Sequence, residues 1–132
     1  MNRTERIVAC PLVRRRGRLH VVLVTGRRYH NWLLPKGRRE DDLTRREVAE
    51  LEAWEEAGVV GSAFGQPSRF RMVAHGGGHR AMLAYGIHVR RLARIWPEQH
   101  QRQRVLVQVD QLDRIPITES LRRCITRLVG QV

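Results

Sequence analysis

Five short runs of the chain are rich in apolar residues and are separated by turn-forming residues. They predict β-strands at residues 7–13, 19–25, 70–74, 81–89 and 105–109. The stretch from Val21 to Val24 is uninterrupted and apolar, which is typical of a strand buried on both faces. Three successive glycines, Gly76 to Gly78, lie between the third and fourth runs and predict the tip of a hairpin.

Two segments have helical spacing instead. Thr44 and Glu47 are spaced as in a capping box, and Gly58 suits the left-handed position just past a helix end, so we expect a helix between them. Thr118 is a residue type that caps helices, and four apolar residues at helical spacing follow it between positions 121 and 128. Strands interleaved with two helices predict a mixed sheet between helices in a single domain, residues 1–132, although other α+β folds share this pattern.

Charge is distributed unevenly along the chain. It carries 25 Lys+Arg and 13 Asp+Glu, a formal net charge of +12, yet eight of the 13 acids lie between Glu40 and Glu56. The excess of positive charge elsewhere favours binding to polyanions, whether nucleotides, inositol phosphates, polyphosphate or nucleic acid.

Three of the clustered acids share one helix face. Glu52, Glu55 and Glu56 are at positions i, i+3 and i+4, where carboxylates repel one another unless a cation joins them. Hard divalent cations such as Mg²⁺ prefer carboxylate and carbonyl oxygens and are often shared with substrate phosphates. A solvated acidic face is the alternative. We rank it second because these acids follow a Pro-Lys-Gly turn, a loop and a helix cap.

The segment that holds these acids resembles the signature of the Nudix hydrolase family. That signature is Gly, five residues, Glu, seven residues, then Arg-Glu-apolar-any-Glu-Glu-any-Gly-apolar. Seven residues stand at the required positions: Gly37, Glu52, Ala53, Glu55, Glu56, Gly58 and Val59. Two positions depart from it, since Leu43 stands where the first Glu is expected and Leu51 where the Arg is expected.

The residues before the signature are similar to those of the diphosphoinositol-polyphosphate and diadenosine-polyphosphate hydrolases of this family. There an apolar strand ends in Thr-Ser-Arg or close to it, and Trp and Pro-Lys-Gly precede the signature; here Thr25-Gly26-Arg27 and residues 32–37 fit. The resemblance covers nearly the whole chain. It implies an α+β fold, the Nudix-type α/β/α sandwich with a mixed β-sheet. It also implies a hydrolase that cleaves a phosphoanhydride in a dinucleoside polyphosphate or a diphosphoinositol polyphosphate.

The resemblance further implies a metal site. The Gly37 carbonyl and the carboxylates of Glu52, Glu55 and Glu56 would bind Mg²⁺ or Mn²⁺, and the three glutamates would be the catalytic residues. Glu52, or a metal-bound water linked to it, would act at the general-base step.

Four basic residues are candidates for binding the phosphates of the substrate: Lys36, Arg27, Arg28 and Arg80. Each could donate charge-assisted hydrogen bonds to phosphate oxygens. Lys36 is the best supported because it adjoins the signature, whereas a solvated surface position is the simpler expectation for any single arginine.

Leu51 cannot hydrogen-bond a carboxylate, whereas the Arg of the family pattern orients the neighbouring Glu. Either another arginine, Arg45 or Arg46, compensates, or the enzyme is slow. Glu98 could lend a further carboxylate from outside the signature, but we favour a surface loop position for it.

Two other classes of function stay open. Leu43 and Leu51 motivate a Nudix scaffold that binds a polyphosphate ligand without useful catalysis. The positive charge motivates a nucleic-acid-binding domain, which we do not favour because aromatic residues amount to 5% and no binding motif is present.

The remaining expectations concern location and assembly. Cys10 and Cys124 lack metal-ligand spacing and predict buried thiols in a reducing compartment. The uncharged run before Arg14 is only seven residues long, from Ile7 to Val13, so we expect neither a signal peptide nor a membrane span. A cytoplasmic protein follows, and the family resemblance implies a monomer or homodimer.

Overall fold

The computed structural model describes residues 5–26, 31–73 and 76–132. None of the helices within these ranges is long and apolar enough to cross a membrane. The elements follow in the order β1 (Arg6–Arg15), β2 (Arg18–Thr25), β3 (Trp32–Leu33), β4 (Lys36–Arg38), α1 (Arg45–Ala57), β5 (Val59–Val73), β6 (His79–Leu92), β7 (Arg104–Gln108), the 3₁₀ helix η1 (Val109–Arg114) and α2 (Glu119–Val129).

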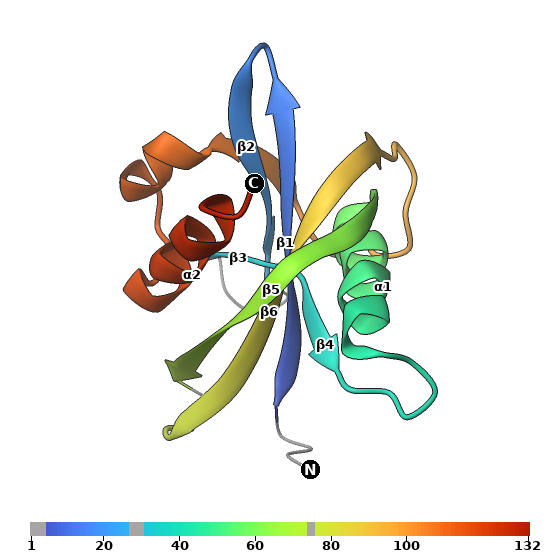
Figure 1. The fold of residues 1–132 in the computed structure, drawn as a ribbon, viewed down its shortest axis with the longest axis vertical. Helices are drawn as coiled ribbons and strands as arrows, with labels where there is room; N and C mark the ends of the chain where they lie inside the picture. Colours follow the sequence, from blue (N-terminus) through green and yellow to red (C-terminus); the bar gives the residue numbers. More distant parts are fainter. Residues whose placement is uncertain (1–4, 27–30, 74–75) are drawn as a thin grey trace.

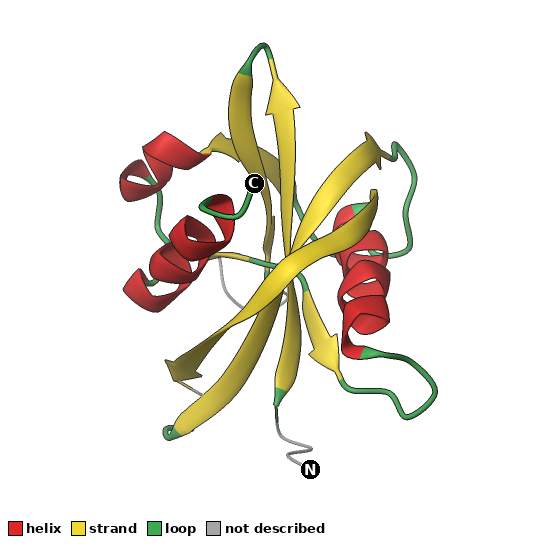
Figure 2. Ribbon diagram, viewed as in Figure 1, coloured by secondary structure: helices red, strands yellow, loops and turns green. Residues whose placement is uncertain are grey.

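The strands form one mixed sheet in the order β3-β2-β1-β6-β5, with β4 paired to β1 and β7 paired to β2. Strands β1 and β6 are parallel, and the other pairs are antiparallel. β1 changes partner along its length, because residues 6–8 pair with β4 and residues 12–15 pair with β2. Helices α1 and α2 lie on opposite sides of the sheet (Figures 1 and 2), which confirms the predicted α/β/α sandwich.

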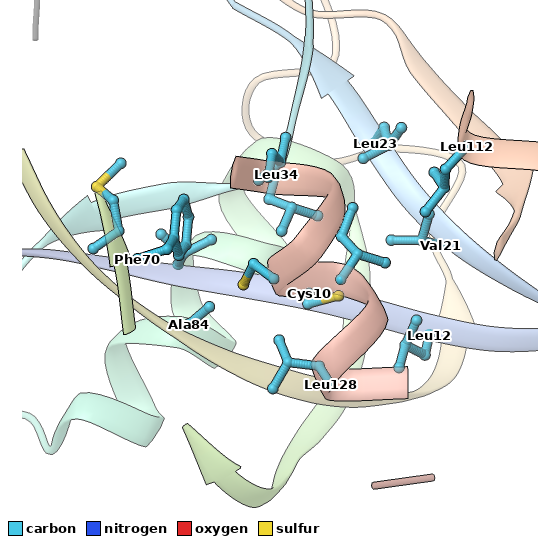
Figure 3. Close-up of a cluster of buried hydrophobic side chains, with 14 residues drawn as sticks. Cys10, Leu12, Val21, Leu23, Leu34, Phe70, Ala84, Leu112 and Leu128 are labelled. Carbon is cyan, nitrogen blue, oxygen red and sulfur yellow. The ribbon is translucent and has the colours of Figure 1, made fainter. Parts of the chain in front are cut away.

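Each face of the sheet has its own hydrophobic core, because successive side chains of a strand point to opposite faces. Along β1, Val8 and Cys10 belong to the cluster beneath α2, and Ile7 and Ala9 belong to the cluster beneath α1. Figure 3 shows the α2 cluster, in which Cys10 lies close to the helix. Cys10 and Cys124 are both buried free thiols, as predicted, and burial raises the pKa of each, that of Cys124 to about 11.

The small side chains of α1 let this helix lie close to the sheet. Ala49, Ala53 and Ala57 are fully buried beneath it, together with Val48. Glu56 is buried on the same helix beside these residues, so the alanine stripe also holds the glutamates near the sheet.

Strand β5 is much longer than the sequence indicated. Residues 70–74 were expected to form a strand, whereas β5 spans Val59–Val73, fifteen residues in all. Its pairing with β6 has two register shifts, at Val60/Gly61 and between Phe64 and Ser68. The second shift contains Gly65 and Pro67, so these turn-forming residues interrupt the ladder as a bulge and do not end the strand.

Candidate active site

Helix α1 begins and ends where the sequence predicted. The Glu47 N–H donates to Thr44 Oγ1 (3.1 Å) and the Glu47 carboxylate accepts from the Thr44 N–H (2.8 Å), so the capping box is complete. Gly58 follows the helix in the left-handed conformation, with φ of 65°. These two local signals fix both the length and the rotation of the helix, and hence the direction in which its glutamates point.

The last turn of α1 carries acids where the helix dipole disfavours them, and it contains no basic residue. Arg104 of β7 supplies the missing cation. Its Nη1 donates to the carbonyl of Ala57 (2.8 Å), and its guanidinium lies 4.1 Å from the ring centroid of Trp96. The indole of Trp96 in turn donates to the carbonyl of Glu56 (3.2 Å). The acidic helix end is therefore held by residues that lie about 40 to 50 positions away in the sequence.

Strand β4 brings a glycine directly against the first glutamate of the cluster. Gly37 pairs with Ile7 of β1, and a Cβ atom at Gly37 would overlap the carboxylate of Glu52. The backbone N–H of the neighbouring Lys36 donates to Glu56 Oε1 at 3.3 Å. Gly37, Glu52 and Glu56 are thus brought together as predicted, and the close approach explains why residue 37 has no side chain.

Burial and mutual repulsion perturb the two inner carboxylates. Burial, followed by the charges of Glu56 and Glu55, raises the pKa of Glu52 to about 8, and Glu52 and Glu56 share a hydrogen bond. Burial also raises the pKa of Glu56, although the charges of Arg102 and Lys36 oppose the rise. Without a further cation these two carboxylates compete for a proton.

Glu55 lies further out on the same helix turn. Burial raises its pKa, and the charges of Glu98 and Glu40 add to the effect. The Glu55 carbonyl accepts the backbone N–H of Glu98 at 3.0 Å, so the loop after β6 is attached to this end of the helix. A fourth carboxylate, that of Glu98, is thereby brought to the edge of the cluster.

The donor set fits a hard divalent cation, because it consists of carboxylate oxygens crowded beside a backbone segment that no side chain shields. The acids are not yet arranged as a finished ligand set, since no group of three or more His, Cys, Asp or Glu side chains in the described ranges has such geometry. Gly37, Glu52, Glu55 and Glu56 are the residues that would hold the ion.

Arg102 is a residue of this site to which the sequence assigned no role. Its guanidinium lies 3.5 Å from Glu56 Oε2, donates to Glu98 Oε1 at 2.9 Å and donates to the Thr25 carbonyl at 3.0 Å. The i, i+4 spacing from Glu98 suits the second of these contacts alone. The favoured surface position for Glu98 was wrong, because its side chain is largely buried against Arg102.

Arg45 and Arg46 do not take the place of the missing signature arginine. Arg45 lies 3.7 Å from Glu5, while Arg46 donates to the carbonyl of Gly65 and lies over the ring of Tyr85. Within the described part of the chain, the cation that contacts a signature glutamate is Arg102.

The two departures from the signature differ in their surroundings. Leu43 packs against the hydrophobic core beneath α1, so an apolar contact replaces the expected carboxylate. Leu51 is half-buried on α1 next to Glu52. The first departure thus has a structural reason, and nothing in the structure explains the second.

A group of basic residues lies beside the carboxylates. Burial lowers the pKa of Lys36, and the nearby charges of Arg102, Arg6 and Arg80 lower it further, while Glu56 opposes them. The sequence predicted Lys36 and Arg80 as phosphate ligands, and the structure brings both to this group. Arg27 and Arg28, predicted for the same role, lie outside the described residues.

Arg6 and Arg38 extend this basic group and were missed. They stand directly opposite one another where β1 pairs with β4. Burial lowers the pKa of Arg6, and the charges of Arg80 and Arg38 lower it further. Like charges on paired strands are unfavourable, which is a cost that a bound anion would relieve. The sequence could not reveal that Arg6 and Arg38 face one another, because the pairing of β1 with β4 joins residues 32 positions apart.

Comparisons with known proteins agree with this geometry. The NUDIX domain family model matches residues 3–128. Two Arabidopsis thaliana proteins are similar in sequence. Nudix hydrolase 18, mitochondrial, is 33% identical over 92 residues, which cover 69% of this chain and 52% of that protein. Nudix hydrolase 13, mitochondrial, is 35% identical over 98 residues, which cover 66% and 48%. The chain therefore spans about half the length of these relatives.

Solved structures share the fold at low sequence identity. A C. elegans Ap4A hydrolase aligns with a TM-score of 0.74 and 13% identity, covering 96% of each chain. The NUDIX domain of Shewanella oneidensis NrtR, crystallised with ADP ribose, aligns with a TM-score of 0.78 and 14% identity, covering 99% of this chain and 89% of that one. The match of the family model over nearly all residues, together with the relatives in sequence, shows that this chain belongs to the NUDIX domain family.

Proposed function

We propose that this protein hydrolyses a phosphoanhydride bond in a phosphorylated small molecule of the dinucleoside polyphosphate or diphosphoinositol polyphosphate type, with Mg²⁺ or Mn²⁺ as cofactor. The observation that carries the proposal is the pair of carboxylates, half-buried Glu52 and buried Glu56, which lie against β4 at Lys36 and Gly37. The shared fold with an Ap4A hydrolase and with an ADP ribose-bound NUDIX domain supports a phosphorylated ligand.

Glu56 and Glu52 have different contacts, which indicate different roles in the reaction. Glu56 accepts from the Lys36 N–H and lies against Arg102, so its orientation is set before any ligand binds. Glu52 contacts no Lys or Arg side chain among the described residues, which leaves it as the candidate general base. A divalent ion held by Gly37, Glu52, Glu55 and Glu56 would supply neutralisation of the phosphate oxygens and activation of the attacking water.

The basic group would bind the phosphates. Lys36 lies close enough to Glu56 for their charges to interact, Arg6 and Arg80 lie near Lys36, and Arg38 stands opposite Arg6. A guanidinium can donate two parallel hydrogen bonds to a phosphate, so several arginines would fix a polyphosphate chain in one register. Such positioning supplies much of the rate enhancement in phosphoryl transfer.

The second candidate function is binding of a polyphosphate without useful catalysis. Leu51 favours this alternative, because a leucine side chain cannot hydrogen-bond the carboxylate of Glu52. The contact of Arg102 with Glu56 argues for hydrolysis, since it gives one signature glutamate a guanidinium partner.

Turnover of three substrates separates these functions: diadenosine tetraphosphate, a diphosphoinositol polyphosphate and ADP-ribose, each with Mg²⁺, with Mn²⁺ and with EDTA. We expect metal-dependent cleavage of at least one, and its loss in Glu52→Gln and in Glu56→Gln. Glu50→Gln is the matched control on the same helix, because its amide oxygen can still accept the N–H of Ala63. Mn²⁺ binding without turnover of any substrate would favour the silent scaffold. If the protein neither binds Mn²⁺ nor cleaves any of the three substrates, the proposed enzyme function is excluded.

A further inference from the structure

A cavity of about 690 Å³ lies away from the carboxylates, at the opposite end of β1 from Gly37. Gly37 is level with Ile7, whereas the cavity begins at Leu12 and continues to the end of the strand. Five residues at roughly 3.3 Å each separate the two by about 17 Å along the strand. In Figure 1 this is the end where the β1–β2 hairpin projects and the C-terminus lies. None of the residues described above for the candidate active site lines it.

The floor of the cavity is apolar. Leu19 of β2 and Phe64 of β5 form it on the side of the sheet that α2 covers, and both are half-buried. The Phe64 ring is held in place by Gly86, where a Cβ atom would lie 2.7 Å from the ring. A concave, largely apolar space of this size is typical of sites for small molecules and not of flat protein interfaces.

Four exposed arginines surround this floor: Arg14, Arg15, Arg90 and Arg91. They follow Leu12 and His88, the last paired residues of the parallel strands β1 and β6, so they lie at the same end of the sheet. Within the described ranges none of the four makes an ion pair with an Asp or Glu side chain, and no Asp or Glu side chain lines the cavity. Clustered like charges destabilise a fold, and an anion would offset that cost.

We propose that this cavity is a second ligand site, which binds a phosphorylated small molecule of nucleotide size with a planar apolar group. The arginines would contact the phosphates through paired hydrogen bonds, and the planar group would lie on the floor formed by Leu19 and Phe64. Single-stranded nucleic acid fits less well, because such ligands stack on exposed aromatic platforms and, among the described residues, Phe64 is the one Phe, Tyr or Trp that lines the cavity.

ATP in EDTA is a suitable probe, because metal-dependent binding at the carboxylates is then suppressed. Calorimetry gives the affinity, and amide chemical shifts of the labelled protein give the location. We expect shifts at residues 12–15 and 88–92 and little change at residues 36–38. Tripolyphosphate, which has no planar group, should bind more weakly than ATP.

Two double variants with the same change in net charge distinguish ATP binding at this cavity from general electrostatic attraction to the protein. R90E/R91E and R122E/R123E change the net charge equally, but the second pair lies on α2 beside Glu119. We expect the first to weaken ATP binding about tenfold or more, and the second by no more than about twofold. R14Q/R15Q, on the other strand, should also weaken binding and replaces R90E/R91E if that variant fails to fold.

Three results would overturn the proposal. Equal losses in the two charge-matched variants would show that only the net charge matters. Shifts confined to residues 36–38 would assign the binding to the candidate active site. Equal affinity for tripolyphosphate, or binding of long single-stranded RNA without binding of ATP, would show that the apolar floor has no role. All of these measurements are independent of whether the protein hydrolyses any substrate.

Discussion

Arg102 organises the carboxylates through contacts that can be removed by one substitution. Its guanidinium bridges Glu56 (3.5 Å) and Glu98 (2.9 Å) and also donates to the Thr25 carbonyl (3.0 Å). Arg102→Met removes the charge and all three contacts while keeping most of the side-chain volume. Both carboxylates would then be left without this cation in a poorly hydrated place.

The size of the effect follows from burial. The side chains of Arg102, Glu56 and Glu98 are 11%, 8% and 16% exposed. Removing one partner of a fully buried ion pair costs about 3–5 kcal/mol. Some water still reaches these groups, and protonation of Glu56 gives partial relief because burial already raises its pKa. We therefore expect a loss of about 2–4 kcal/mol in the free energy of unfolding.

Urea denaturation in EDTA near neutral pH measures this loss, with Arg123→Met as the matched control. Arg123 also follows a glutamate by four positions, but its side chain and that of Glu119 are 68% and 53% exposed. Exposed pairs contribute little, so the control should lose far less stability. If Arg102→Met and Arg123→Met have equal effects, Arg102 does not anchor the carboxylates and the explanation given for Glu56 is wrong.

Three further substitutions test the surroundings of the site. Gly37→Ala places a methyl group on the Glu52 carboxylate, so Mn²⁺ affinity measured by calorimetry should fall about tenfold or more; Gly130→Ala, where the added carbon lies 3.3 Å from its nearest neighbour, should leave it unchanged. Leu51→Arg should raise the steady-state hydrolysis rate by less than about tenfold if Arg102 compensates, and a gain of about a hundredfold would indicate a decayed site. Arg104→Met removes a cation from the end of α1, and we expect urea denaturation to show a loss of about 1–3 kcal/mol; unchanged stability would mean that the helix end does not depend on it.

Local signals predicted helix α1 and the direction of its glutamates. A cap at Thr44, a left-handed glycine at position 58 and the spacing of three acids all act within one segment, so no tertiary information was needed. The apolar runs at residues 7–13 and 19–25 likewise predicted the positions of β1 and β2. In each case the sequence pattern and the element that it predicts lie in the same stretch of chain.

Contacts between distant segments could not be predicted in this way. Strand β4 has three residues and follows Pro35, so it has no strand periodicity of its own and exists because β1 pairs with it. Arg102 reaches Glu56 across 46 positions, and one of 24 arginines cannot be singled out without the fold. Location in the cytoplasm and a monomeric or dimeric state stay predictions.

An anomalous difference map from crystals soaked in Mn²⁺ tests the central claim most directly, because it locates the ion without relying on turnover. We predict one strong peak within coordination distance of Glu52 and Glu56 and adjacent to the backbone of Gly37. Its absence from that position at saturating Mn²⁺, or a peak only at surface carboxylates such as Glu119, would contradict the metal-dependent hydrolysis proposed for this protein.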